Sequence, residues 1–198
     1  SAQLVRERYA DQSRHGFEWA WLSPAVFADG AAAAVLANSA PEDEGLIGVS
    51  FETHPETELV LYPGGGGLAV TRAENADDHA YVMDAGAVSR AFQVYMQRNL
   101  ELLAAHPQTK KFGIHDFSRV YIHQANGTLV RAFSRTLGLP DEKVPVNIDR
   151  YGNTSSASTL LLLDEDRRTS RVKNGDLVLF LWIGAGIGAM NGFAVFRL

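Results

Sequence analysis

The hydrophobic and polar positions of this chain follow a helical period in some segments and a strand-like pattern in others. Residues 85–104 carry the longest helical pattern, because apolar side chains recur there every three or four positions. The positions that share this face, and are expected to be buried, are Val88, Ala91, Phe92, Tyr95, Met96, Asn99, Leu102 and Leu103. Pro107 marks the end of the element.

After residue 115 short apolar runs alternate with helical patterns. The runs indicate strands at 117–122, 144–148, 176–183 and 193–198, and the patterns between them indicate helices at 126–138 and 154–170. Strands and helices that alternate through short connections predict a layered α/β fold with a partly parallel sheet.

The first third of the chain has a weaker pattern. A short helix is expected at 2–11, and strands are expected at 46–53, 58–62 and 80–83. The small-residue run at 26–37 fits a helix by alanine propensity or a buried strand by its flanking turn signals. A tight turn at Asp29-Gly30 followed by a buried strand is favoured, because the run is short and a polar loop follows at 41–45. The four glycines at 64–67 lack a Gly-Lys-Ser/Thr ending, so a mobile loop is favoured over a phosphate-binding loop.

Composition and charge exclude several classes of function. The net charge is -5 and the pI is near 5.6, so the chain has no charge pattern for binding nucleic acid. There is no cysteine, which excludes disulfides, thiolate metal sites and a cysteine nucleophile within this chain. No apolar run approaches the ~20 residues of a membrane span, and the N-terminus does not resemble a signal peptide. A cytoplasmic protein that binds neither nucleic acid nor membrane is expected.

Two strand-to-helix junctions carry the candidate chemistry. His123 ends an apolar run and is followed by Gln124-Ala125-Asn126, and Asn153 follows Gly152 at the next such junction. Ligands gather at the carboxyl ends of parallel strands, so both side chains are expected to face one crevice. The alternative is a structural histidine and an asparagine that only forms a turn or caps a helix. The other histidines lie in polar or loop contexts and are expected at the surface: His15, His54, His79, His106 and His115.

A glycine-rich segment near the C-terminus is a third candidate. Between Ile183 and Gly188 three of six residues are glycine, directly after a buried strand. The segment is either a hairpin turn between the last two strands or a loop that aims backbone N–H groups at a developing oxyanion.

These segments together resemble the C-terminal half of the ketoacyl synthase III family of the thiolase superfamily. The residues that carry the resemblance are His123-Gln124-Ala125-Asn126, the segment from Tyr151 to Ser158, and the Gly184 to Gly188 loop, with Asp29-Gly30-Ala31 as a weaker match. The resemblance implies a layered α-β-α thiolase-like fold. It implies two parts, residues 1–40 as the tail end of the N-terminal half with its last strand, and residues 41–198 as the C-terminal half.

The resemblance also implies a decarboxylative condensing enzyme with a Cys-His-Asn triad. His123 and Asn153 are the expected catalytic residues, and the backbone around Gly184, Ala185 and Gly186 is the expected oxyanion loop. Residues expected to contact substrate or pantetheine are Gly86, Ala125, Asn126 and Ile183. No cofactor is expected to be permanently bound, and the expected substrates are thioesters of CoA or acyl carrier protein. The cysteine is expected on a companion chain or an N-terminal fragment, with the complete unit forming a dimer.

Some positions depart from the family pattern, and two other functions stay open. The family's Phe-Thr-Trp motif is replaced by the segment from Ile187 to Asn191, and Ala87, Arg90 and Thr128 replace typical tunnel or carrier-protein residues. These departures favour a specialised biosynthetic relative. One alternative is acyl transfer to an oxygen or nitrogen nucleophile on the same fold. The other is a non-catalytic partner subunit of a heteromeric ketosynthase.

Overall fold

The structure, a computed structural model, describes residues 26–36, 44–57, 60–61, 82–83, 85–185 and 188–198. The strands are β1 (Gly45–His54), β2 (Val60–Leu61), β3 (Val82–Met83), β4 (Arg119–Ile122), β5 (Leu177–Ala185) and β6 (Ala189–Arg197). The α-helices are α3 (Ala85–Ala105), α4 (Gly127–Thr136), α5 (Ile148–Tyr151) and α6 (Ser158–Arg168). Short 3-10 turns cover Ile114–Asp116, Asp141–Lys143 and Ser155–Ala157.

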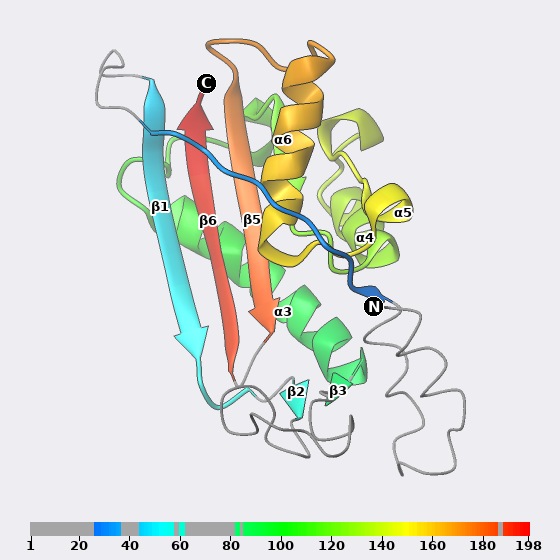
Figure 1. Cartoon of the computed structure of the whole chain (residues 1–198). Coiled ribbons are helices and arrows are strands. Elements are labelled where there is room, and N and C mark those ends of the chain that lie inside the picture. Colours follow the sequence, from blue (N-terminus) through cyan, green and yellow to red (C-terminus); the bar gives the residue numbers. More distant parts are fainter. Residues whose placement is uncertain (1–25, 37–43, 58–59, 62–81, 84, 186–187) are drawn as a thin grey trace.

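A mixed four-stranded sheet in the order β1-β6-β5-β4 is the centre of the fold (Figure 1). β4 and β5 are parallel, whereas β5 with β6 and β6 with β1 are antiparallel. β5 is buried over most of its length, which explains its almost continuous apolar sequence. β2 and β3 form a separate two-stranded sheet.

Helices cover the two faces of the sheet. Figure 1 shows α3 behind the sheet and α6 in front of it. Behind the sheet, Phe92 and Met96 of α3 and Val130 of α4 join a core with Leu181 and Phe193. In front, a second core holds Tyr121 of β4, Leu162 of α6 and Phe180 of β5. The chain therefore has the expected helix–sheet–helix layering, and the mixed sheet confirms the partly parallel arrangement.

Ala194 and Phe196 of β6 also join this second core, but other front-face side chains of β1 and β6 are exposed. The pairing register places Phe51, Gly192 and Trp182 in one row across β1, β6 and β5. Phe51 is 66% exposed and Met190 is 46% exposed. Part of the sheet's front face, at β1 and at Met190 of β6, is therefore apolar and open to solvent in the part of the chain that the structure describes.

Most predicted elements are found close to their expected limits. The eight residues expected to share the buried face of the helix at 85–104 are all buried or half-buried in α3. The strands at 46–53, 117–122 and 176–183 are present as β1, β4 and β5, and the helices at 126–138 and 154–170 as α4 and α6. The last strand begins earlier than predicted, at Ala189. Of the strands predicted at 58–62 and 80–83, the structure describes Val60–Leu61 and Val82–Met83, and both pairs are strand.

The strand predicted at 144–148 is wrong. This segment follows a 3-10 turn and leads into α5. Its backbone bonds to side chains in place of a neighbouring strand: Arg131 donates to the Val144 carbonyl (2.8 Å), and Asn147 N–H donates to Gln124 Oε1 (3.1 Å). Because these side chains satisfy the backbone polar groups, no sheet partner is needed.

The buried strand predicted at 26–37 is also wrong for the residues described. Residues 28–36 are irregular and exposed, and Val35 is 94% exposed. The segment pairs only at its start, through an isolated parallel bridge between Phe27 and Asn153. Beyond that bridge no described strand lies beside it to complete a ladder. The predictions at 2–11 and 64–67 fall outside the described residues.

Two of the histidines expected at the surface are half-buried. His54 stacks on Tyr95 with ring centroids 4.3 Å apart, and His106 lies edge-on to Phe193 at 5.7 Å. His115 is exposed as predicted, and His15 and His79 lie outside the described residues.

Candidate active site

His123 lies directly beyond the carboxyl end of β4. Its backbone N–H donates to the Leu181 carbonyl at 2.9 Å, which extends the parallel pairing of β4 with β5 by one residue. The apolar run that forms β4 is buried on both sides, so the chain leaves the sheet only at this polar residue. The imidazole is thereby placed at the carboxyl edge of the parallel strands, where ligands commonly bind.

Gln124 links the two candidate junctions. Its side chain is fully buried; its Nε2 donates to the Ile122 carbonyl (2.8 Å), and its Oε1 accepts from Asn147 N–H (3.1 Å). One amide therefore joins the end of β4 to the loop that leads to Asn153. A buried amide with both ends satisfied fixes the positions of the two segments relative to each other.

The backbone of Asn153 is fixed from the other side by the N-terminal segment. Asn153 N–H donates to the Val26 carbonyl (3.0 Å), and its own carbonyl accepts from Ala28 N–H (2.9 Å). Gly152 before it has φ +71, and a Cβ there would lie 3.0 Å from the Ala28 Cβ. Glycine is favoured at this position both for its left-handed φ and for this close approach.

The side chain of Asn153 has a defined orientation. Its Oδ1 accepts from the backbone N–H of Ser155 at 2.8 Å, and Ser155 adopts φ 53, an uncommon conformation for a residue with a side chain. Because the carbonyl oxygen is bound, the amide NH₂ remains to donate elsewhere. The strained turn thus orients a hydrogen-bond donor.

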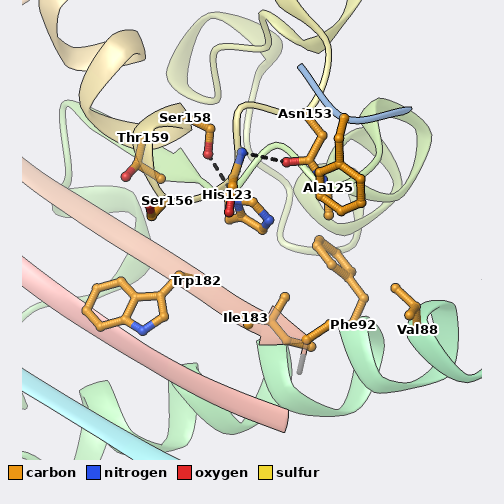
Figure 2. A pocket seen from close by; sticks show the side chains of 14 residues that line it. Val88, Phe92, His123, Ala125, Asn153, Ser156, Ser158, Thr159, Trp182 and Ile183 are labelled. Carbon is orange, nitrogen blue, oxygen red and sulfur yellow. Dashed lines mark hydrogen bonds between the residues drawn. The ribbon is translucent and has the colours of Figure 1, made fainter. Parts of the chain in front are cut away.

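A cavity of 430 Å³ lies where these junctions meet. Figure 2 shows the His123 ring between Ser158 and the centre of the cavity, with Asn153 beside it and Phe92 and Val88 on the opposite wall. The lining residues are Phe27, Val88, Phe92, His123, Ala125, Asn153, Ser155, Ser156, Ser158, Thr159, Trp182, Ile183, Gly184 and Ala185. The walls are mainly apolar with a few convergent polar groups, which is typical of a small-molecule site.

His123 is neutral at physiological pH. Burial lowers its pKa to about 4, although the backbone of Ser155 partly opposes the shift. Its Nδ1 lies 2.9 Å from Ser158 Oγ. A neutral imidazole in this environment is suited to donating or accepting a hydrogen bond, and it carries no charge of its own. Among the described residues, no group of three or more His, Asp or Glu side chains could hold a metal ion.

Comparison with known proteins shows what this sequence is similar to. Residues 108–198 match the family model for the C-terminal domain of 3-oxoacyl-[acyl-carrier-protein] synthase III. This part of the chain is similar to the C-terminal domain of the ketoacyl synthase III family. Similar proteins include the beta-ketoacyl-[acyl-carrier-protein] synthases III of Rhodopirellula baltica and Xanthomonas campestris. The first is 37% identical, over 71% of this chain and 40% of its own length. The second is 35% identical, over 81% of this chain and 48% of its own length.

Solved structures give the same result for the fold. The beta-ketoacyl-[acyl carrier protein] synthase III of Thermus thermophilus is 28% identical, with a TM-score of 0.64 over 80% of this chain and 47% of that chain. The layered thiolase-like fold is therefore confirmed. The chain spans less than half the length of these ketoacyl synthase III relatives. None of its described helices is long and apolar enough to cross a membrane.

The structure brings together most of the residues that resemblance to the ketoacyl synthase III family singled out. Those that line the cavity are His123, Asn153, Ala125, Ile183, Gly184 and Ala185. Asn126 lies outside this lining and caps α4, where its side chain accepts from the N–H groups of Thr128 and Leu129. Gly86 is exposed at the start of α3 and does not line the cavity. Gly186 lies outside the described residues.

The glycine-rich segment joins the last two strands as a hairpin. Gly184 pairs with Met190 and Ala185 pairs with Ala189. This pairing fits the first of the two sequence interpretations, a connection between the last two strands, although Gly186 and Ile187 lie outside the described residues. The second interpretation stays a prediction, since Gly184 and Ala185 also border the cavity.

Several lining residues were not identified from the sequence as parts of the site. Phe92 and Val88 were predicted only as core positions of a helix, and Trp182 only as part of a strand. Phe27 reaches the cavity from a segment about 100 positions away from His123. In the sequence, Ser158 stands out only as part of the segment from Tyr151 to Ser158. None of these residue types distinguishes a cavity wall from a core in the sequence, because both are apolar or small.

Proposed function

We propose that this chain forms part of a condensing enzyme that joins an acyl thioester to a malonyl-type extender with loss of carbon dioxide. The observation that carries the proposal is the convergence of His123 and Asn153 on one cavity. Asn153 has its carbonyl oxygen occupied and its NH₂ group available. His123 is neutral and part-buried. Two neutral donors in a mainly apolar cavity suit stabilisation of an oxyanion.

The reaction would proceed in two stages. A cysteine thiolate first takes the acyl group from CoA or a carrier protein, and the donor thiol leaves. The malonyl thioester then binds with its carbonyl oxygen toward His123 and Asn153. When the carboxylate leaves as carbon dioxide, its bonding pair forms an enolate whose oxygen both residues stabilise. The α-carbon of the enolate attacks the acyl-cysteine carbonyl, forms the carbon–carbon bond and releases the thiolate.

The nucleophile has to come from outside these 198 residues, because they contain no cysteine. The open face of β1 and β6 supports an associated polypeptide. Its exposed apolar side chains, Leu46, Val49, Phe51 and Met190, form a surface that favours contact with another protein segment. We propose that this face packs against the cysteine-bearing part, either an upstream segment or a companion chain, and that the complete unit is a dimer able to use acyl carrier protein.

The reaction is tested by following its two stages separately in the complete protein. Acyl transfer is measured as a mass increase on the cysteine-bearing polypeptide after incubation with acyl-CoA. Decarboxylation is measured as release of labelled carbon dioxide from malonyl thioester. His123→Ala is expected to lower decarboxylation by roughly 100-fold or more, the usual effect of removing one oxyanion donor, while acylation continues.

The matched control is His115→Ala, which removes an exposed histidine outside the cavity. This variant is expected to keep both stages. If His123→Ala loses acylation but keeps decarboxylation, the proposed roles are wrong. If the wild-type protein acylates an oxygen or nitrogen nucleophile without releasing carbon dioxide, simple acyl transfer replaces condensation. If no polypeptide takes the acyl label, the non-catalytic partner subunit is the better explanation.

The associated polypeptide is tested by co-purification. Phe51→Asp places a charge on the open face, whereas Val94→Asp places one at a comparably exposed position of α3 behind the sheet. We expect the first to weaken association with the cysteine-bearing part and the second to leave it unchanged. A well-folded, soluble monomer of residues 1–198 alone would contradict the proposal.

A further inference from the structure

Ser158 lies directly behind His123. It is the first residue of α6 and is fully buried. Its Oγ lies 2.9 Å from Nδ1 of His123 and accepts from Gln124 N–H at 3.3 Å. Figure 2 shows the Ser158 hydroxyl on the side of the imidazole away from Asn153.

The hydrogen bonds of this hydroxyl favour one position for the proton of the neutral His123 ring. A serine hydroxyl has one proton to donate and two lone pairs to accept with. One lone pair takes the Gln124 N–H. If Ser158 donates its proton to Nδ1, every group is satisfied, and the proton of a neutral imidazole lies on Nε2.

The opposite arrangement satisfies fewer groups. If Nδ1 carried the proton and donated to Ser158, the hydroxyl proton would need another acceptor. Among the described residues, Ser158 Oγ has hydrogen bonds only to His123 and Gln124. A buried hydroxyl proton without an acceptor is unfavourable. The Nε2–H form of His123 is therefore the favoured tautomer.

We propose that Ser158 is a positioning residue that holds His123 in the Nε2–H tautomer and so directs an N–H donor at the thioester oxygen. This inference rests on the proposed function for its catalytic meaning, but the tautomer itself can be observed without any reaction. An Nε2 without a proton would present a lone pair to the developing enolate oxygen and repel it. The hydroxyl thus converts a histidine that could accept or donate into a donor.

Loss of the hydroxyl should affect the decarboxylation stage alone. Ser158→Ala is expected to lower kcat for decarboxylation about 10- to 100-fold, with little change in KM, because residues that orient a catalytic group typically contribute this much. Acylation of the cysteine should continue. Ser158→Thr keeps a hydroxyl at the same position and is expected to retain most of the activity.

The control for a purely structural role is Ser134→Ala. Ser134 is also fully buried, and its hydroxyl donates to the Leu139 carbonyl at 3.1 Å, outside the cavity. Both alanine variants lose one buried hydroxyl hydrogen bond, so they should lose similar stability. Only the variant at Ser158 should change which ring nitrogen of His123 carries the proton.

The deciding measurement is nitrogen NMR of the complete protein with ¹⁵N-labelled histidine, in which the two ring nitrogens differ according to which one is protonated. The proposal expects Nε2–H at His123 in wild type, in Ser134→Ala and in Ser158→Thr. It expects a shift toward Nδ1–H in Ser158→Ala, together with the fall in kcat. An Nδ1–H signal in the wild-type protein overturns it.

An unchanged tautomer and kcat in Ser158→Ala also overturn the proposal. If Ser158→Ala does not fold, the tautomer of His123 in the wild-type protein and the activity of Ser158→Thr still test the proposal. If the wild-type protein shows Nε2–H but releases no carbon dioxide, the proposed function fails while the role of Ser158 in fixing the tautomer stands.

Discussion

Lowering the pH should destabilise this protein through His123. Burial lowers the pKa of His123 from 6.5 to about 4. Below about pH 6.5 the unfolded chain binds a proton at this residue that the folded state does not bind, so stability falls as pH decreases. The loss begins near the unfolded pKa and is complete once the pH passes below the folded pKa. A shift of this size corresponds to about 3 kcal/mol in total.

Part of this loss is accessible to a simple experiment. Between about pH 7 and about pH 5 the free energy of unfolding should fall by about 2 kcal/mol from His123 alone. The assay is urea unfolding of the complete protein at both pH values, in wild type and in His123→Gln, which cannot take up the proton. Other titrating groups contribute to both proteins and cancel in the difference between them.

The expected result is a pH-dependent decrease that is about 2 kcal/mol smaller in His123→Gln than in wild type. The reasoning is refuted if both proteins lose the same stability over this range. It is also refuted if an NMR titration of the His123 ring gives a midpoint near the unfolded value. Either result would mean that the cavity is hydrated enough to solvate an imidazolium.

Two further predictions concern the sheet next to the cavity. The buried Asn191 side chain donates to Asn99 Oδ1 (2.7 Å) and accepts from His54 Nε2 (2.6 Å). Asn191→Ala removes both hydrogen bonds and should lower the free energy of unfolding, measured by chemical denaturation, by about 1–3 kcal/mol. An unchanged midpoint would mean that water replaces the lost partner. Gly192→Ala should lower the midpoint of thermal unfolding, because the new Cβ would lie 2.6 Å from a backbone oxygen of β1. In the control Gly113→Ala the new Cβ meets nothing closer than 3.6 Å, so its thermal midpoint should hardly change. Equal midpoints for the two glycine variants would contradict this.

The parts of the fold that were predictable are those with a repeated local pattern. α3 was predicted over nearly its full length because its apolar face continues for more than five helical turns. β5 was predicted because an apolar run of its length, bounded by a turn signal, is typical of a central strand. In both, the buried residues follow from the local pattern of apolar positions: a helical period in α3 and a continuous run in β5.

The incorrect predictions share a different cause. The run at 144–148 is apolar enough for a strand, but the side chains of Arg131 and Gln124 satisfy its backbone. The run at 26–37 has small apolar residues, but strand formation needs a neighbour, and pairing stops after the bridge at Asn153. Short segments do not contain the information about which distant groups will meet them.

The sequence by itself determined most of the order of strands and helices, the two polar junctions at His123 and Asn153, and the resemblance to a family of condensing enzymes. Each of these depends on residues close together in the chain. Only the tertiary structure decided that Ser158 contacts His123 across 35 positions, that Phe27 and Trp182 close the cavity, and that burial lowers the pKa of His123. Those properties depend on which surfaces exclude water from one another, and that is settled by packing between segments far apart in sequence.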